Sequence, residues 1–188
     1  MKAAERKDAW RRLDRDLRDL RRAAKRWRPA HRGFRGLEAG MRRAQRRGRE
    51  ALARARKSGA AADFHEWRKE LKALWYQLRL VEAIAPAIRR DVRALHQAET
   101  WLGDDHNLVV LCEELSKNAS LCPDRIVLDR VRLAADRLQC ELRARAVDVA
   151  KGIYGHRPRP YVRGVERAWK AWRHASHRRP RRSRRQAA

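Results

Sequence analysis

The residues best suited to chemistry lie in the segment FHEWRKELKALWYQLRL, residues 64–80. His65, Arg68, Lys72 and Arg79 follow one another at steps of three, four and seven residues, so on an α-helix they share one face over four turns. Such a row presents a cation about once per turn, roughly every 5.4 Å. A single exposed ion pair contributes about 0–1 kcal/mol, but several cations on one rigid face can hold a polyanion together. The spacing therefore predicts a phosphate-binding face.

Two more side chains of the segment, Lys69 and Tyr76, flank this row at helical spacing. The same pattern also fits the solvated face of an ordinary amphipathic helix, and His65 also fits a capping or core histidine. Binding is favoured because only Glu66 and Glu70 offer local counter-charges and because an arginine-dense segment precedes the row. Near a helix N-terminus, the helix dipole disfavours the cationic form of His65, which can still donate a hydrogen bond when neutral.

The arginine-dense segment is predicted to be a helix over residues 37–57. Its apolar stripe consists of small residues, which let a neighbouring backbone approach closely. Five of its arginines are further candidates for ligand binding: Arg42, Arg43, Arg46, Arg47 and Arg49. Arg42, Arg46 and Arg49 share one helical face and Arg43 and Arg47 share another, and the spacing leaves open which face points inward.

The segment LGDDHNL, residues 102–108, combines oxygen and nitrogen ligand types in adjacent positions. Gly103 predicts an interruption or kink in the helical pattern. Adjacent side chains on a helix cannot all converge on one ion, so we expect no metal site and no cofactor here. Gly103, Asp104, Asp105 and Asn107 are instead expected to form a turn or cap, with His106, that hydrogen-bonds a basic residue. The sequence contains no phosphate loop GxxxxGK[ST] and no nucleophile elbow, so we expect no enzyme activity.

Helical periodicity runs through nearly the whole chain and predicts an all-α fold, an antiparallel bundle of about six or seven helices. The predicted helices cover about 8–27, 37–57, 63–85, 87–102, 108–117, 123–151 and 160–175. In the third helix, the stripe Phe64, Trp67, Leu71, Leu74, Leu78 and Val81 is expected to be buried. Asp63 and Glu66 fit a capping box at its start, and Pro123 fits the first turn of the sixth helix. Residues 176–188 carry no apolar anchor and are expected to form a basic disordered tail.

The chain of 188 residues has a net charge of +26, which favours polyanionic partners. This charge is uneven: residues 1–60 carry 22 Lys/Arg against 7 Asp/Glu, residues 61–150 carry 14 against 15, and residues 151–188 carry 13 against 1. Arginine suits bidentate contacts to phosphate oxygens. Three scattered cysteines indicate reduced thiols in a cytoplasmic protein, and no apolar run approaches a membrane span.

The motif helix followed by LGDDHNLVVL resembles the second half of the CHAD domain, the histidine-containing α-helical domain. GLEAGMRRAQRRGREALARARKS and YGHRPRPYVRGVERAWKAW also resemble helices of that family, so one CHAD-like domain is expected over residues 8–175. The family's first half, with its own basic helix, is not visible. The resemblance therefore implies half or more of a CHAD-type bundle, and an exposed half-bundle face favours a homodimer.

This resemblance implies that the chain binds inorganic polyphosphate without catalysis, through His65, Arg68, Lys69, Lys72 and Tyr76, and next through the arginines of residues 42–49. Arg79 continues the same row. Association with polyphosphate granules is the corresponding expectation for location. Two alternatives remain open: a nucleic-acid-binding protein, RNA- or ribosome-associated, which needs exposed aromatic side chains for base stacking, and a polyphosphate-processing enzyme, which needs a metal-binding acidic cluster.

Overall fold

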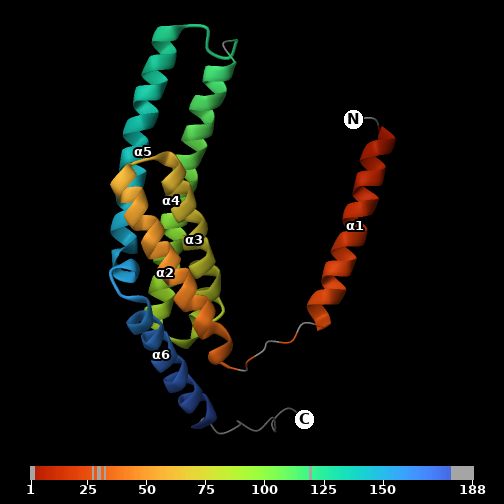
Figure 1. Cartoon of the computed structure of the whole chain (residues 1–188), viewed down its shortest axis with the longest axis vertical. Helices are drawn as coiled ribbons and strands as arrows, with labels where there is room; N and C mark the ends of the chain where they lie inside the picture. Colours follow the sequence, from red (N-terminus) through yellow and green to blue (C-terminus); the bar gives the residue numbers. More distant parts are fainter. Residues whose placement is uncertain (1–2, 27, 29–30, 32, 119, 179–188) are drawn as a thin grey trace, which may run out of the picture. The chain divides into compact units, whose positions relative to one another are not determined.

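The computed structural model describes residues 3–26, 28, 31, 33–118 and 120–178. The chain divides into two compact units, Met1–Gly36 and Leu37–Ala188. The first holds helix α1 (Ala3–Arg26) and the second holds the remaining helices, which Figure 1 shows side by side. These are α2 (Arg35–Ser58), α3 (Ala61–Arg79), the 3₁₀ turn η1 (Glu82–Ile84), α4 (Pro86–Lys117), α5 (Arg125–Tyr154) and α6 (Pro158–Arg178). No strand occurs among the residues described, so the predicted all-α fold is confirmed.

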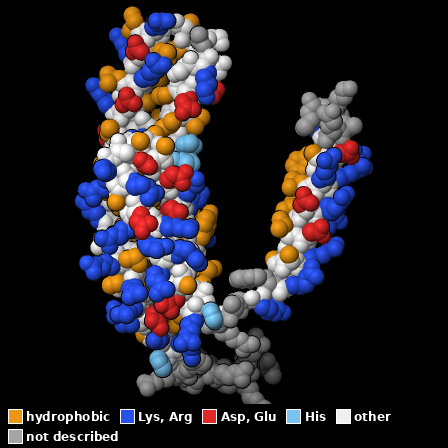
Figure 2. Space-filling view, viewed as in Figure 1, with side chains coloured by type: hydrophobic (Ala, Val, Ile, Leu, Met, Phe, Trp, Pro, Cys, Tyr) orange, Lys and Arg blue, Asp and Glu red, His pale blue; other side chains and the backbone are white. Residues whose placement is uncertain are grey.

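Helix α1 is amphipathic, as the sequence predicts. Within its own unit, the apolar side chains Trp10, Leu13, Leu17 and Leu20 are 46–70% exposed. They form one stripe, visible in orange in Figure 2, and the opposite side carries the charged residues. None of the helices described carries an apolar run that could span a bilayer.

The core of the second unit is built around the predicted stripe of α3. Phe64, Trp67, Leu71, Leu74 and Leu78 are all buried, and Val81 just beyond the helix is buried with them. They pack with buried side chains of the other helices, among them Ile88, Val92, Leu95, Leu102, Ala146 and Ile153. A fully buried leucine contributes about 1.5–3 kcal/mol of transfer free energy, so this stripe accounts for much of the stability of the unit.

The prediction of a break at Gly103 is wrong, because α4 runs without interruption from Pro86 to Lys117. Gly103 takes part in the helix, and a Cβ added there would lie 3.2 Å from Nη2 of Arg68 on α3. Glycine at this position therefore allows the Arg68 side chain to lie close to the α4 backbone. Its lower helix propensity is a modest cost. Residues 102–108 form part of a helix and make no turn or cap.

Two predicted helix starts are also wrong. Helix α3 has Ala60 as its N-cap with no side-chain cap, and Asp63 lies in the first turn, where its carboxylate accepts a hydrogen bond from Ser58 Oγ at 2.5 Å. The capping box with Glu66 is therefore absent. The N-cap of α5 is Asp124, whose carboxylate accepts hydrogen bonds from the backbone N–H groups of the following turn, so Pro123 precedes the helix.

Candidate anion-binding site

The cation row on α3 lies against α4, where one carboxylate holds two of its members. Glu99 Oε1 is 2.7 Å from Arg68 Nη2 and 3.4 Å from Lys72 Nζ. Arg68 Nε also donates to the backbone carbonyl of Glu99 at 3.4 Å. The Glu99 side chain is only 12% exposed, so this ion pair is shielded from solvent. Helical spacing correctly predicted that Arg68 and Lys72 share one face of α3. The structure shows that this face lies against α4, where Glu99 already pairs with both cations.

His65 packs against His106 of α4, with ring centroids 4.5 Å apart. Its Nδ1 is buried and has no hydrogen-bond partner. Burial lowers the pKa of His65, and the nearby His106 and Lys69 lower it further. Because the pKa lies below its ordinary value of 6.5, the imidazole is neutral at pH 7 in the free protein, and burial is the largest cause.

Lys69, Tyr76 and Arg79 lie on the more exposed part of α3. Lys69 forms an ion pair with Glu66 at 2.7 Å, and Tyr76 is 52% exposed. The guanidinium of Arg79 lies over the ring of Trp75, 5.2 Å from its centroid. These side chains do not converge on one place, and the first of them is already neutralised by its neighbour.

The arginines of α2 all lie outside the core, because small residues fill its buried stripe. A Cβ at Gly48 would lie 2.5 Å from Tyr154 Oη, so only glycine allows α2 to seat on the C-terminal part of α5. The buried Gln45 donates through Nε2 to the carbonyls of Ile153 and His156, at 3.2 and 2.8 Å. Arg49 Nη1 also donates to the carbonyl of His156 at 3.4 Å. Helix α2 thus clamps the turn between α5 and α6.

This clamp brings the start of α6 beside the first half of α2 and creates a groove with a cavity volume of about 810 Å³. Its walls include Ala39, Pro158 and Pro160. Six arginines line it, here called the groove arginines: Arg42, Arg43 and Arg46 from α2, and Arg157, Arg159 and Arg163 from α6 and the residue before it. The space-filling view shows the lower part of this unit densely covered by Lys and Arg (Figure 2).

The groove arginines have little acidic compensation. Within the part of the chain that the structure describes, only Arg42 has a carboxylate within 4.0 Å, that of Glu38 at 3.9 Å. Guanidinium groups remain charged at any physiological pH, so close packing of several raises the local positive potential. A multivalent anion with oxygens at regular spacing would relieve this repulsion through bidentate hydrogen bonds.

Comparison with known families identifies the family to which the chain belongs. The model of the CHAD domain matches residues 1–116, which include α1 to α4. The chain belongs to the CHAD domain family. Its α5 and α6 lie beyond the matched residues, so half of the groove arginines belong to the part outside the match. Comparisons with curated proteins and with solved structures found no match.

In this CHAD protein, sequence reasoning found half of the groove and missed the other half. Arg42, Arg43 and Arg46 were among the predicted residues and line the groove, whereas Arg47 and Arg49 do not. Arg157, Arg159 and Arg163 were not predicted. Their signal was the segment HRPRPYVR, in which arginines surround two prolines at a helix start, but nothing local shows that it folds back onto α2.

The DDHN segment of the CHAD motif stabilises the helix packing. Asp105 is buried and its Oδ1 lies 2.7 Å from Nε of Arg143 on α5, while Gln139 donates to its backbone carbonyl at 3.2 Å. Burial raises the pKa of Asp105, although the hydrogen bond from Arg143 acts in the opposite direction. The predicted basic partner therefore exists, but it belongs to α5 and not to the motif helix. Among the described residues, no group of three His, Cys, Asp or Glu could hold a metal.

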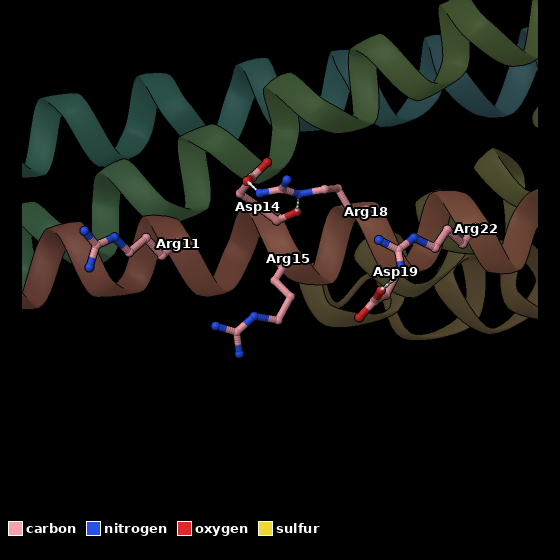
Figure 3. A pocket seen from close by; sticks show the side chains of 6 residues that line it. All are labelled: Arg11, Asp14, Arg15, Arg18, Asp19 and Arg22. Atoms are coloured by element: carbon pink, nitrogen blue, oxygen red, sulfur yellow. Dashed lines mark hydrogen bonds and ion pairs between the residues drawn. The ribbon is translucent and has the colours of Figure 1, made fainter.

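A second charged hollow lies along α1 (Figure 3). Its six lining residues all come from this one helix: Arg11, Asp14, Arg15, Arg18, Asp19 and Arg22. Arg18 pairs with Asp14, and Arg22 lies 3.7 Å from Asp19, as the dashed lines show. Because its cations and carboxylates alternate along one exposed surface, this hollow is the solvated side of an amphipathic helix.

Proposed function

We propose that this chain binds inorganic polyphosphate, without catalysis, in the groove between α2 and α6. CHAD domains bind polyphosphate, and the chain belongs to this family. The observation that carries the proposal is the set of six groove arginines, of which only one has a carboxylate within 4.0 Å among the described residues. Linear polyphosphate presents charge and oxygen geometry but no bases, and guanidinium groups recognise both features.

The cation row of α3 has a secondary role in this proposal. Arg68 and Lys72 can contact a phosphate only by sharing or leaving the carboxylate of Glu99, which reduces their net gain. The groove arginines make no such exchange, apart from Arg42. A chain of phosphates therefore binds first in the groove and extends from there over the remaining cationic surface.

The test is a competition experiment on the full chain at physiological salt. A fluorescent polyphosphate of fixed length is displaced by unlabelled polyphosphate, by single-stranded RNA and by duplex DNA of equal phosphate concentration. We expect polyphosphate to compete best, and its affinity to fall steeply with salt because counterions are released. Equal or better competition by RNA would reject polyphosphate as the preferred ligand.

Nucleic-acid binding is the second candidate, and one observation favours it. Tyr76 is 52% exposed on a helix that also carries the exposed cations Lys69 and Arg79, and stacking of an unpaired base needs such an exposed aromatic ring. Tyr76→Ala separates the two functions: it should weaken RNA binding and leave polyphosphate binding unchanged.

The absence of catalysis and the cellular location are tested separately. Incubation of the chain with polyphosphate and Mg²⁺ or Mn²⁺ should release no phosphate above the level without protein. A fluorescent fusion should colocalise in the cytoplasm with polyphosphate granules. Release of phosphate that the groove variants abolish would instead assign a processing enzyme.

A further inference from the structure

The hairpin of α4 and α5 extends past α2 and α3, so no other helix of the second unit packs on its distal half (Figure 1). Six of the partly exposed large apolar side chains in this half follow one helical stripe on each helix and are here called the apolar strip. They are Leu108, Leu111 and Leu115 on α4, and Val127, Val131 and Leu138 on α5. Leu111, Val127 and Leu138 are 45–46% exposed. Within each helix the residues recur at steps of three, four or seven, so they form a stripe.

The two stripes lie on the same side of the hairpin. Its other side is marked by a hollow between the helices, to which α4 contributes Glu113 and α5 contributes Asp136. At about 100° per residue, a side chain two positions further points about 200° away. Leu115 therefore lies on the opposite side of α4 from Glu113, and Leu138 on the opposite side of α5 from Asp136. The apolar strip therefore lies on one side of the hairpin, facing away from this hollow.

Charge distinguishes this part of the chain from every other. Residues 104–141 carry 8 Asp/Glu against 5 Lys/Arg, a net charge of −3. The net charge of the whole chain is +26, so the remaining residues together carry +29. A polyanion therefore finds no attraction here. Copies of so basic a chain repel one another over most of their surface, and the hairpin is where they can approach.

The borders of the apolar strip are complementary to each other. On the α4 side stand the acidic Asp104 and Glu114, and on the α5 side stand Arg130 and Arg137. Asp104, Arg130 and Arg137 have no ion pair with any described residue, whereas Glu114 is held by Lys117 Nζ at 3.4 Å and by Asn118 Nδ2 at 3.4 Å. A two-fold axis through the strip would place the acidic border of one copy opposite the arginine border of the other.

We propose that the apolar strip is the contact through which two copies of this chain pair, with α4 of each copy lying on α5 of its partner. The two hairpins then form a four-helix arrangement, which covers the apolar side chains and matches the charged borders. The basic groove lies outside this contact and remains open on each copy.

Sedimentation or light scattering of the full chain, without polyphosphate, measures the pairing. We expect a dimer of twice 22.1 kDa at micromolar concentrations. Leu111→Glu with Leu138→Glu should raise the dissociation constant at least tenfold and leave the helical circular dichroism unchanged, because both positions are already exposed. Val110→Glu with Leu133→Glu is the matched control, since these side chains are 42% and 53% exposed but lie outside the strip. A wild-type monomer at about 100 μM, or equal effects of both pairs, would overturn the proposal.

Charge swaps test the orientation. Arg130→Glu with Arg137→Glu should weaken pairing, Asp104→Arg with Glu114→Arg should weaken it also, and all four changes in one chain should restore it. If each helix instead lay on the same helix of the partner copy, like charges would face each other in every variant, and none of the swaps would change the pairing. A further arm, Leu13→Glu with Leu17→Glu, changes the exposed stripe of α1. Loss of the dimer in that variant, with an intact dimer in the strip variant, would assign the contact to α1 and reject the hairpin.

Discussion

The two groups of cations in the second unit that the sequence singled out, on α3 and on α2, differ in their counter-charges. On α3, Arg68 and Lys72 share the shielded carboxylate of Glu99, and Lys69 pairs with Glu66. In the groove between α2 and α6, one arginine in six has an acidic partner within the described residues. A cation that already holds a carboxylate gains little from a phosphate, whereas an uncompensated cluster gains a favourable partner. The positive charge available for binding, and not the number of basic residues, therefore distinguishes a binding surface.

The groove should respond most strongly to charge reversal. Arg46→Glu with Arg159→Glu places a carboxylate on each wall, and we expect polyphosphate affinity to fall about 30-fold, which corresponds to roughly 2 kcal/mol. Fluorescence titration at physiological salt measures it. Arg89→Glu with Arg93→Glu on α4 changes the net charge equally outside the groove and should cost less than about threefold. Equal losses in the two variants would mean that only net charge matters.

A change in the packing of α2 against α5 should have the next largest effect. Gly48→Ala adds a Cβ where Tyr154 lies at 2.5–2.7 Å, so α2 must move away from α5. Overpacking of this kind costs about 1–3 kcal/mol, so thermal unfolding should shift downward, and polyphosphate affinity should fall as the two walls separate. Gly152→Ala is the control, because its added Cβ meets no atom within 4 Å. A lower melting temperature with unchanged affinity would show that the groove does not depend on this contact.

Removal of the carboxylate that pairs with the α3 cations should have a smaller effect, and it should raise polyphosphate affinity. Glu99→Gln removes the charge that holds Arg68 and Lys72, and we expect polyphosphate affinity to rise about threefold, as for partly exposed ion pairs. The same titration checks it, with thermal unfolding as the record of structural damage. An increase above tenfold would reverse the comparison and make α3 the principal site. Glu70→Gln serves as the neighbouring control.

The pH dependence through His65 should be the smallest effect. Burial lowers the pKa of His65 below its ordinary value of 6.5, so the unbound imidazole is neutral at pH 7 and the fold loses stability as the pH falls below 6.5. A nearby polyanion favours the protonated form, so polyphosphate affinity should rise about twofold between pH 7.5 and 5.5. His65→Gln should abolish this rise. A pH dependence that survives the substitution would exclude His65 as its source.

Local patterns were sufficient for much of the fold. The stripe from Phe64 to Leu78 is buried as its spacing predicts, and the charge asymmetry already separated a neutral core region from basic flanks. The break predicted at Gly103 is wrong, because the sequence alone does not distinguish a glycine inside a helix from a glycine at a helix break. Only the approach of Arg68 from α3 shows which of the two applies.

The sequence by itself determined that this chain forms amphipathic helices, which of their faces are apolar, and that its net charge is strongly positive. Helical spacing decides these properties within a few turns, because side chains three and four residues apart share a face. The tertiary structure alone decided which cations are available. Glu99 neutralises Arg68 from a different helix, and Gln45 brings Arg157 and its neighbours beside α2 from more than 100 residues away. Such contacts depend on the rotation and register of whole helices, and no short stretch of residues encodes them.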